Sequence, residues 1–258
     1  MNFAQTVLLG AIAGLTIYLG LPIGRLKNLS EKTRSFLAMI STGILIFLFY
    51  DIFSQMSHPI EDALTHKNLA QGVLLLLMGG LGLMVGLLGL VTFERRFIRA
   101  RFGAQQALPP AQLGLMIATG IGMHNFSEGL AIGQSAGRGE IAFATMLIVG
   151  FGLHNATEGF GIVGPLLGDK PSSWGFIGLA GLIGGGPTFL GTLLGYYLVS
   201  TTLSVLFLSL AAGALLYIIG EMFHLNWRQA TKVPAAWGLL LGLLFAFLTD
   251  LVLVMAGV

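Results

Sequence analysis

Apolar residues fill most of this chain in long stretches that short polar segments separate. A helix that crosses a membrane needs about 20 mostly apolar residues. The uncharged stretch 171–220 is about twice as long as one crossing requires, so we divide it at Ser200–Thr202. The pattern predicts an all-α polytopic membrane protein with one transmembrane domain, 1–258. Its eight predicted spans are approximately 2–24, 35–56, 71–92, 109–135, 139–165, 172–199, 202–223 and 234–257.

The composition excludes several other classes of protein. Only 9% of the 258 residues are charged and 55% are hydrophobic, whereas about 25% are charged in an ordinary soluble domain. The chain contains no cysteine, which excludes disulfides, thiolate metal sites and cysteine nucleophiles. Its net charge is only +2 with no basic face, so we do not expect it to bind nucleic acid.

Basic residues indicate how the spans are oriented, because cytoplasmic loops carry an excess of Lys and Arg. Eight spans place both termini on the same side. If that side is the outside, the outer loops hold only Lys67 and Arg138, and all other basic residues lie inside. We therefore predict outside termini and cytoplasmic loops at 25–34 and 93–108. The predicted inner residues are Arg25, Lys27, Lys32, Arg34, Arg95, Arg96, Arg99, Arg101, Lys170, Arg228 and Lys232.

The predicted fourth and fifth spans each contain one copy of the pattern H-N-x-x-E-G, at 124–129 and 154–159. The offset of 30 residues equals one span, a short turn and the return, so both copies are expected at mid-membrane in antiparallel neighbours. Within each copy, His and Glu lie one helical turn apart on the same face, and Asn lies about 100° round the helix.

These residue types favour a divalent cation. Two such faces supply imidazoles, carboxylates and amide oxygens, a ligand set suited to Zn²⁺ and other first-row divalent ions. An ionisable group at the bilayer centre costs about 2.5–3.5 kcal/mol of insertion free energy. Two motif copies without a function would therefore be unfavourable. The alternatives are a hydrogen-bonding His or a polar clamp between helices. The predicted metal ligands are His124, Asn125, Glu128, His154, Asn155 and Glu158.

The paired motifs resemble those of the ZIP family of divalent metal transporters, over the whole chain. HNFSEG followed by LAIG, and HNATEG followed by FGIVGP, are most similar to its prokaryotic GufA-type branch. The resemblance implies a cell-membrane location and a two-metal site on the six residues. It also implies a transport unit of spans 1, 4, 5 and 6 that moves like an elevator against a scaffold of spans 2, 3, 7 and 8.

The chain departs from the family pattern at three positions. Many members carry Pro before the motif Glu, where this chain has Ser127 and Thr157, so the helix kink that Pro would cause is in question. Several members have a Glu beside Pro in the sixth span, where Thr188 follows Pro187 here. The missing carboxylate implies a second metal site that is weak or absent.

Further polar residues lie in or near the spans. Asp51 is a candidate entrance residue, with helix capping or pairing as the alternative. Glu221 and His224 are candidate exit residues, with an interfacial anchor as the alternative. We interpret Asp250 as a structural polar contact. The polar segment after Met56 is expected to be a solvated loop that includes His66, with cation gathering as the alternative.

The predicted function is Zn²⁺ uptake into the cytoplasm by alternating access, with Cd²⁺, Fe²⁺ and Mn²⁺ as other candidate substrates. We expect no prosthetic group and no enzymatic activity. The expected partners are the metal ions and the lipid bilayer. The sequence does not decide whether the chain forms a homodimer. One alternative is a membrane metalloenzyme, although the di-iron pattern Glu-x-x-His and the zinc protease pattern H-E-x-x-H are absent. The other is a metal-selective channel or sensor.

Overall fold

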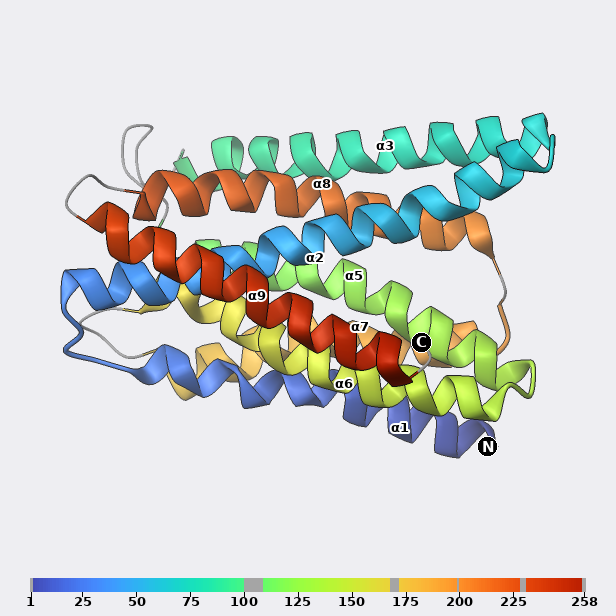
Figure 1. Cartoon of the computed structure of the whole chain (residues 1–258), viewed down its shortest axis with the longest axis horizontal. Coiled ribbons are helices and arrows are strands. Elements are labelled where there is room, and N and C mark those ends of the chain that lie inside the picture. The colour runs from blue at the N-terminus through green and yellow to red at the C-terminus, as the bar shows by residue number, and fades with distance from the viewer. Residues whose placement is uncertain (1, 100–108, 168–171, 199, 228–230, 257–258) are drawn as a thin grey trace.

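Long helices that run side by side make up the described part of the chain (Figure 1). The computed structural model describes 2–99, 109–167, 172–198, 200–227 and 231–256, without the side chains of 97–99, 154, 252–254 and 256. These residues contain no strand. The helices are α1 (Phe3–Leu15), α2 (Glu31–Thr65), α3 (Leu69–Phe93), α5 (Pro110–Gly137), α6 (Ile141–Val163), α7 (Trp174–Gly195), α8 (Thr201–Asn226) and α9 (Lys232–Ala256).

Side-chain caps explain where several helices begin. Ser30, Ser173 and Ser200 each accept a hydrogen bond from the backbone N–H three residues later, which satisfies a donor that the first turn leaves unpaired. The division predicted at Ser200–Thr202 is confirmed, because Ser200 caps α8. After α1 the chain continues as two 3₁₀ turns, Thr16–Leu19 and Leu21–Arg25.

Seven of the described helices are long and apolar enough to cross a membrane, which agrees with an all-α membrane protein. The helix outside that set is α5, which is 28 residues long. It carries His124, Asn125, Ser127 and Glu128 within a single turn and a half, and these residues lower its hydropathy. Most of its side chains are buried against other helices, so the bundle rather than lipid surrounds its polar turn.

The helix α2 is longer than the sequence predicts. It has 35 residues and continues through Pro59 to Thr65, so it is roughly 52 Å long at 1.5 Å per residue. The hydrocarbon core of a bilayer is only about 30 Å thick. The prediction of a loop after Met56 is wrong, because this segment forms further turns of α2. Similarly, the predicted loop 93–108 begins with a helical turn, Glu94–Arg99.

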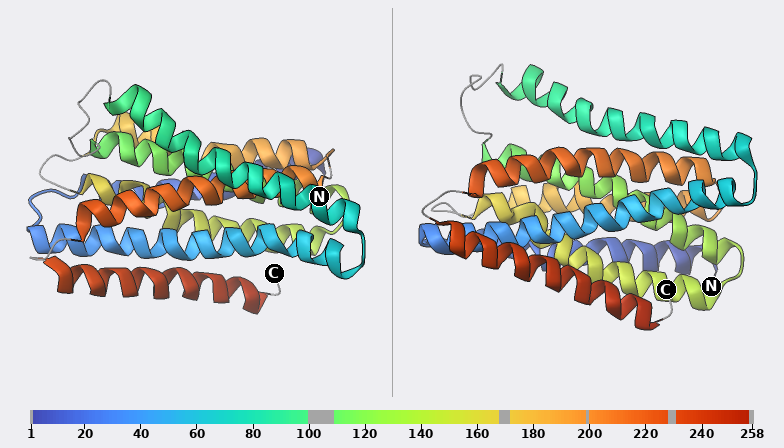
Figure 2. Two further views of the ribbon diagram at one scale, coloured as in Figure 1. Left: turned by 90° about the horizontal axis from the view of Figure 1, so that it is seen from above. Right: turned by 45° about the horizontal axis from the view of Figure 1, so that its top comes forward.

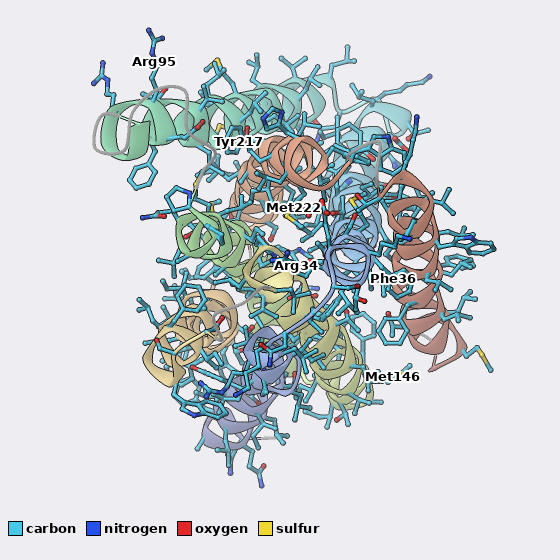
Figure 3. The ribbon with its side chains drawn as sticks, turned by 90° about the vertical axis from the view of Figure 1, so that its left-hand side faces the viewer. Arg34, Phe36, Arg95, Met146, Tyr217 and Met222 are labelled. Atoms are coloured by element: carbon cyan, nitrogen blue, oxygen red, sulfur yellow. The ribbon has the colours of Figure 1, made fainter. Side chains whose placement is uncertain are left out.

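The helices pack in two groups. The helices α1, α5, α6 and α7 pack mainly on one another, as do α2, α3, α8 and α9. A view along the bundle places the groups on opposite sides, with Arg95 pointing away from both (Figure 3). The helix α9 follows an outer edge in both views of Figure 2. The resemblance assigns the same helices to a transport unit and a scaffold, and motion between them stays a prediction.

Both chain ends lie at the same end of the bundle (Figure 1). We call this the terminal end, and the other the far end. The last turns of α2, α5 and α7 lie at the terminal end, and the first turns of α2 and α9 lie at the far end (Figures 1 and 2).

Candidate functional site

The structure brings the two H-N-x-x-E copies together between α5 and α6. His124 Nε2 lies 3.2 Å from Glu128 Oε1, one turn along the same helix, and 3.9 Å from Glu158 Oε1 of α6. Both helices run unbroken through the motif, so Ser127 and Thr157 leave the helices without the break that Pro would introduce.

Asn125 connects the second copy to a third helix. Its Nδ2 donates hydrogen bonds to Glu158 Oε2 and to the backbone carbonyl of Gly184 in α7, each at 3.0 Å. The side chain thereby holds the Glu158 carboxylate in place. We call His124, Asn125, Glu128 and Glu158 the central cluster.

The central cluster is buried away from solvent. His124, Asn125 and Glu158 have no exposed surface, and Glu128 is 3% exposed. Buried polar atoms in proteins almost always have hydrogen-bond partners, yet several oxygens here have none among the described residues. They are Asn125 Oδ1, Glu128 Oε2, Asn155 Oδ1 and Thr188 Oγ1.

The two motif copies dock on their partner helices in the same way. Asn125 donates to the Gly184 carbonyl of α7, and Asn155 donates to the Ala13 carbonyl of α1 at 3.1 Å. Four residues further along each partner helix, a carbonyl meets the motif glycine. A Cβ on Gly129 would lie 2.2 Å from the Thr188 carbonyl oxygen, and one on Gly159 would lie 2.0 Å from that of Ile17.

The partner helices α1 and α7 also contact each other reciprocally. A Cβ on Gly14 would lie 2.2 Å from the Gly185 carbonyl oxygen, and a Cβ on Gly185 equally close to that of Gly14. Both helices are irregular at this level, because Pro187 interrupts the hydrogen bonds of α7 and α1 turns into a 3₁₀ turn at Thr16. The four helices therefore form two matching pairs, α5 with α7 and α6 with α1.

The second histidine lies on α6, but its side chain is outside the described residues, so the structure does not test His154 as a ligand. Within the described side chains, no group of three or more His, Asp or Glu residues is arranged to hold a metal ion. His124, Glu128 and Glu158 nevertheless supply one nitrogen and two carboxylates within hydrogen-bond or ion-pair range. This donor set suits a first-row divalent cation once water or further side chains complete the shell.

Asp51 of α2 approaches the central cluster from the other helix group. It is half-buried, accepts a hydrogen bond from Gln55 Nε2 at 2.7 Å, and interacts electrostatically with His124 and Glu128. Asp250 of α9 lies close enough to Asp51 to interact with it. The two acids predicted near the outer side are therefore neighbours of one another, and Asp51 is also a neighbour of the central cluster.

The remaining candidates lie toward the far end. Glu221 is half-buried and His224 is exposed, both near the end of α8. A cavity of about 410 Å³ at this end separates the two helix groups, with Ser35 of α2 and Asn226 of α8 on one side and Pro110 of α5 on the other. Neither Glu221 nor His224 lines this cavity.

Sequence reasoning missed two acceptors in the site and one buried carboxylate outside it. It did not anticipate the Gly184 and Ala13 carbonyls as acceptors for the motif asparagines, although Pro187 within an apolar span signals an irregular helix. It also missed the buried Glu94 of the far end, which accepts a hydrogen bond from Tyr217 of α8.

No family model and no curated protein sequence matches this chain.

Proposed function

We propose that this protein carries divalent transition-metal cations, with Zn²⁺ as the first candidate, across the cell membrane into the cytoplasm. The observation that carries the proposal is the central cluster, in which two carboxylates and an imidazole lie fully buried beside oxygens that have no hydrogen-bond partner in the described residues. The resemblance of both motif copies to the ZIP family supports the same function.

The energetic cost of burying the ionisable groups of the central cluster favours a functional role for them. Carboxylates and imidazoles inside a membrane bundle are costly and are usually functional. A divalent cation would neutralise Glu128 and Glu158 together and give the orphaned oxygens an electron-pair acceptor. The four oxygens come from α5, α6 and α7, so a bound ion would also connect the helices of one group.

The two helix groups suit transport by alternating access. The central cluster belongs to the first group, and Asp51 reaches it from the second. The far-end cavity lies between the groups, and we propose it as the cytoplasmic side of the path. Movement of the first group against the second would then carry the ion from one side to the other.

Uptake by the purified protein in liposomes tests the proposal. We expect Zn²⁺ to accumulate, and we expect His124→Ala, Glu158→Gln and His154→Ala to abolish uptake while thermal unfolding stays cooperative. Thr201→Ala, at the start of α8 and far from the cluster, is the control. Uptake by all three variants at the wild-type rate would contradict the assignment of the site.

Competition by Cd²⁺, Fe²⁺ and Mn²⁺ then ranks the substrates, because intrinsic affinity follows the Irving–Williams order and selectivity comes from geometry. Saturable uptake with slow turnover would support a carrier. Ion flux at channel rates, or metal-dependent turnover of an organic substrate without any flux, would favour the two alternatives.

We also propose eight spans with both termini outside. Because the chain has no cysteine, single cysteines can report the topology directly. In intact cells, a membrane-impermeant thiol reagent should label Arg138→Cys but not Lys27→Cys. The reverse pattern would contradict the orientation, and labelling of both would contradict the number of spans.

A further inference from the structure

A buried hydrogen bond connects the two helix groups on the far-end side of the central cluster. The Ser41 hydroxyl of α2 donates to the backbone carbonyl of Gly161 in α6 at 2.7 Å, and Ser41 has no exposed surface. Ser41 belongs to the second helix group and Gly161 to the first. The bond can therefore persist only while the two groups keep their present positions.

The sequence of α6 explains why this carbonyl accepts a donor from another helix. In an α-helix the Gly161 carbonyl would accept from the N–H of residue 165, but Pro165 has no N–H. Ser41 supplies a donor from outside the helix. A Cβ on Gly164 would lie only 2.4 Å from the Ser41 side chain. Gly164 and Pro165 together thus prepare the end of α6 for a close contact with α2.

Apolar side chains surround this hydrogen bond. A Cβ on Gly161 would meet Leu45 of α2 at 3.5 Å and Ile121 of α5 at 4.0 Å, and a Cβ on Gly164 would meet Met222 of α8 at 3.6 Å. Leu45, Ile121 and Met222 are fully buried, and Met222 lies near the middle of the bundle in Figure 3. Interiors packed in this way exclude a hydrated cation. We call this layer the far-end seal, which consists of Ser41, Leu45, Ile121, Gly161, Gly164 and Met222.

The far-end seal lies between the central cluster and the far-end cavity. Along α6, Gly161 follows Glu158 by three residues, and Pro165, which lines the cavity, is four residues further. Along α2, Ser41 lies six residues inward from Ser35, which also lines the cavity. An ion that moves from the cluster to the cavity would therefore have to pass the seal.

We propose that the Ser41–Gly161 hydrogen bond holds the far-end seal closed, and that release of a cation into the far-end cavity requires this bond to break. The role in release rests on the proposed transport function, whereas the closure itself does not. A single neutral hydrogen bond suits a reversible closure, because its net contribution is modest. Water that enters from the cavity can also replace it when the groups separate.

Distances between spin labels test the closure on the full chain in nanodiscs. Because the chain has no cysteine, Lys32→Cys on α2 and Ala111→Cys on α5 place one exposed label on each group, next to residues that line the cavity. We expect Ser41→Ala to raise the fraction of molecules with a changed label distance about fivefold, the equilibrium effect of one ordinary hydrogen bond. The matched control is Ser209→Ala, a buried serine whose hydroxyl donates within α8. Equal distance distributions for the two variants would overturn the proposal.

Gly164→Ala tests the same contact from α6. The added methyl group would meet Ser41 so closely that α2 and α6 have to separate. We therefore expect the label distances to change in the same direction as in Ser41→Ala, and by at least as much. Gly178→Ala, where an added Cβ meets nothing within 4 Å, is the control and should leave the distances unchanged. An unchanged distribution for Gly164→Ala would contradict the closure.

Stopped-flow transfer of Zn²⁺ from the loaded protein to a chelator tests the role in release. We expect Ser41→Ala to release Zn²⁺ about fivefold faster than the wild type, by the same loss of one hydrogen bond, and Ser209→Ala to release it at the wild-type rate. Changed label distances with an unchanged release rate would overturn the role in release. If the wild type binds and transports no Zn²⁺ but Ser41→Ala still changes the distances, the closure stands and the proposed transport function fails.

Discussion

The two H-N-x-x-E-G copies share a sequence and a mode of docking, but they differ in what their partner helices offer. On α7, the carbonyl that meets the motif glycine belongs to Thr188, whose buried Oγ1 has no hydrogen-bond partner in the described residues. On the 3₁₀ turn that follows α1, the equivalent carbonyl belongs to Ile17, which is apolar. The backbone contacts of the two motif copies are therefore nearly symmetric, whereas the set of oxygens around them is not.

The two motif asparagines also differ in their hydrogen-bond acceptors, and again the copy on α5 has more polar partners. Asn125 donates both to a partner carbonyl and to the opposing Glu158, whereas Asn155 donates to the Ala13 carbonyl. Glu158 is thus held from α5, and Glu128 contacts the His124 of its own helix. The comparison teaches that a sequence repeat can build a common frame while single residues on neighbouring helices set the chemistry on each side.

The largest expected effect separates the two glutamates. We expect Glu158→Gln to reduce Zn²⁺ affinity by more than the roughly 10–100-fold that loss of an outer-shell partner costs, because Asn125 positions this carboxylate in addition to the His124 contact that both glutamates share. Glu128→Gln should have a smaller effect. Isothermal titration of both variants measures the difference, and equal losses would mean that the site is symmetric.

Substitution of the two motif glycines tests the common frame. Gly129→Ala and Gly159→Ala each drive a methyl group into a backbone carbonyl, so we expect both to lower the free energy of unfolding by about 1–3 kcal/mol. The control is Gly178→Ala in α7, where an added Cβ meets nothing within 4 Å. Denaturant unfolding in detergent measures the change. Destabilisation by only one of the two motif variants would break the symmetry of the frame.

The asparagine pair should show unequal costs. Asn125→Ala leaves the Glu158 carboxylate and the Gly184 carbonyl without this donor, and an unsatisfied buried group costs about 1–3 kcal/mol. Asn155→Ala removes one hydrogen bond to a carbonyl, a net cost of about 1 kcal/mol. Unfolding of the metal-free protein separates the two, and a larger loss for Asn155→Ala would reverse the comparison.

The smallest expected effect concerns Thr188. Thr188→Val removes a buried hydroxyl that has no partner in the described residues, so the metal-free protein should be as stable as the wild type or more stable. If Oγ1 contributes to cation binding, the Zn²⁺ affinity should fall severalfold. Ile17→Val, in the 3₁₀ turn that follows α1, is the matched control and should leave the affinity unchanged. An unchanged affinity for Thr188→Val would remove this oxygen from the site.

Local patterns were sufficient for most of the fold. Apart from the end of α2 and the 3₁₀ turns after α1, the apolar stretches predicted the positions of the helices to within a few residues, because a span is defined by its own length and hydropathy. The structure adds serine caps at the starts of α2, α7 and α8, which are local contacts as well. The part of α2 after Met56 was not predictable in this way. Its polar residues indicate a loop, although the helix continues through Pro59.

The sequence by itself determined the fold class, the paired motifs and the matching of His with Glu along each helix, because all of these follow from spacing within one or two elements. Only the tertiary structure decided that α1 and α7 supply carbonyls to the asparagines and that Asp51 approaches His124. It also decided that Thr188 lies opposite one motif glycine, where Ile17 lies opposite the other. Asn155 and Ala13 are 142 residues apart. Contacts at such separations depend on which helix faces meet, and hydropathy along a chain carries no record of that choice.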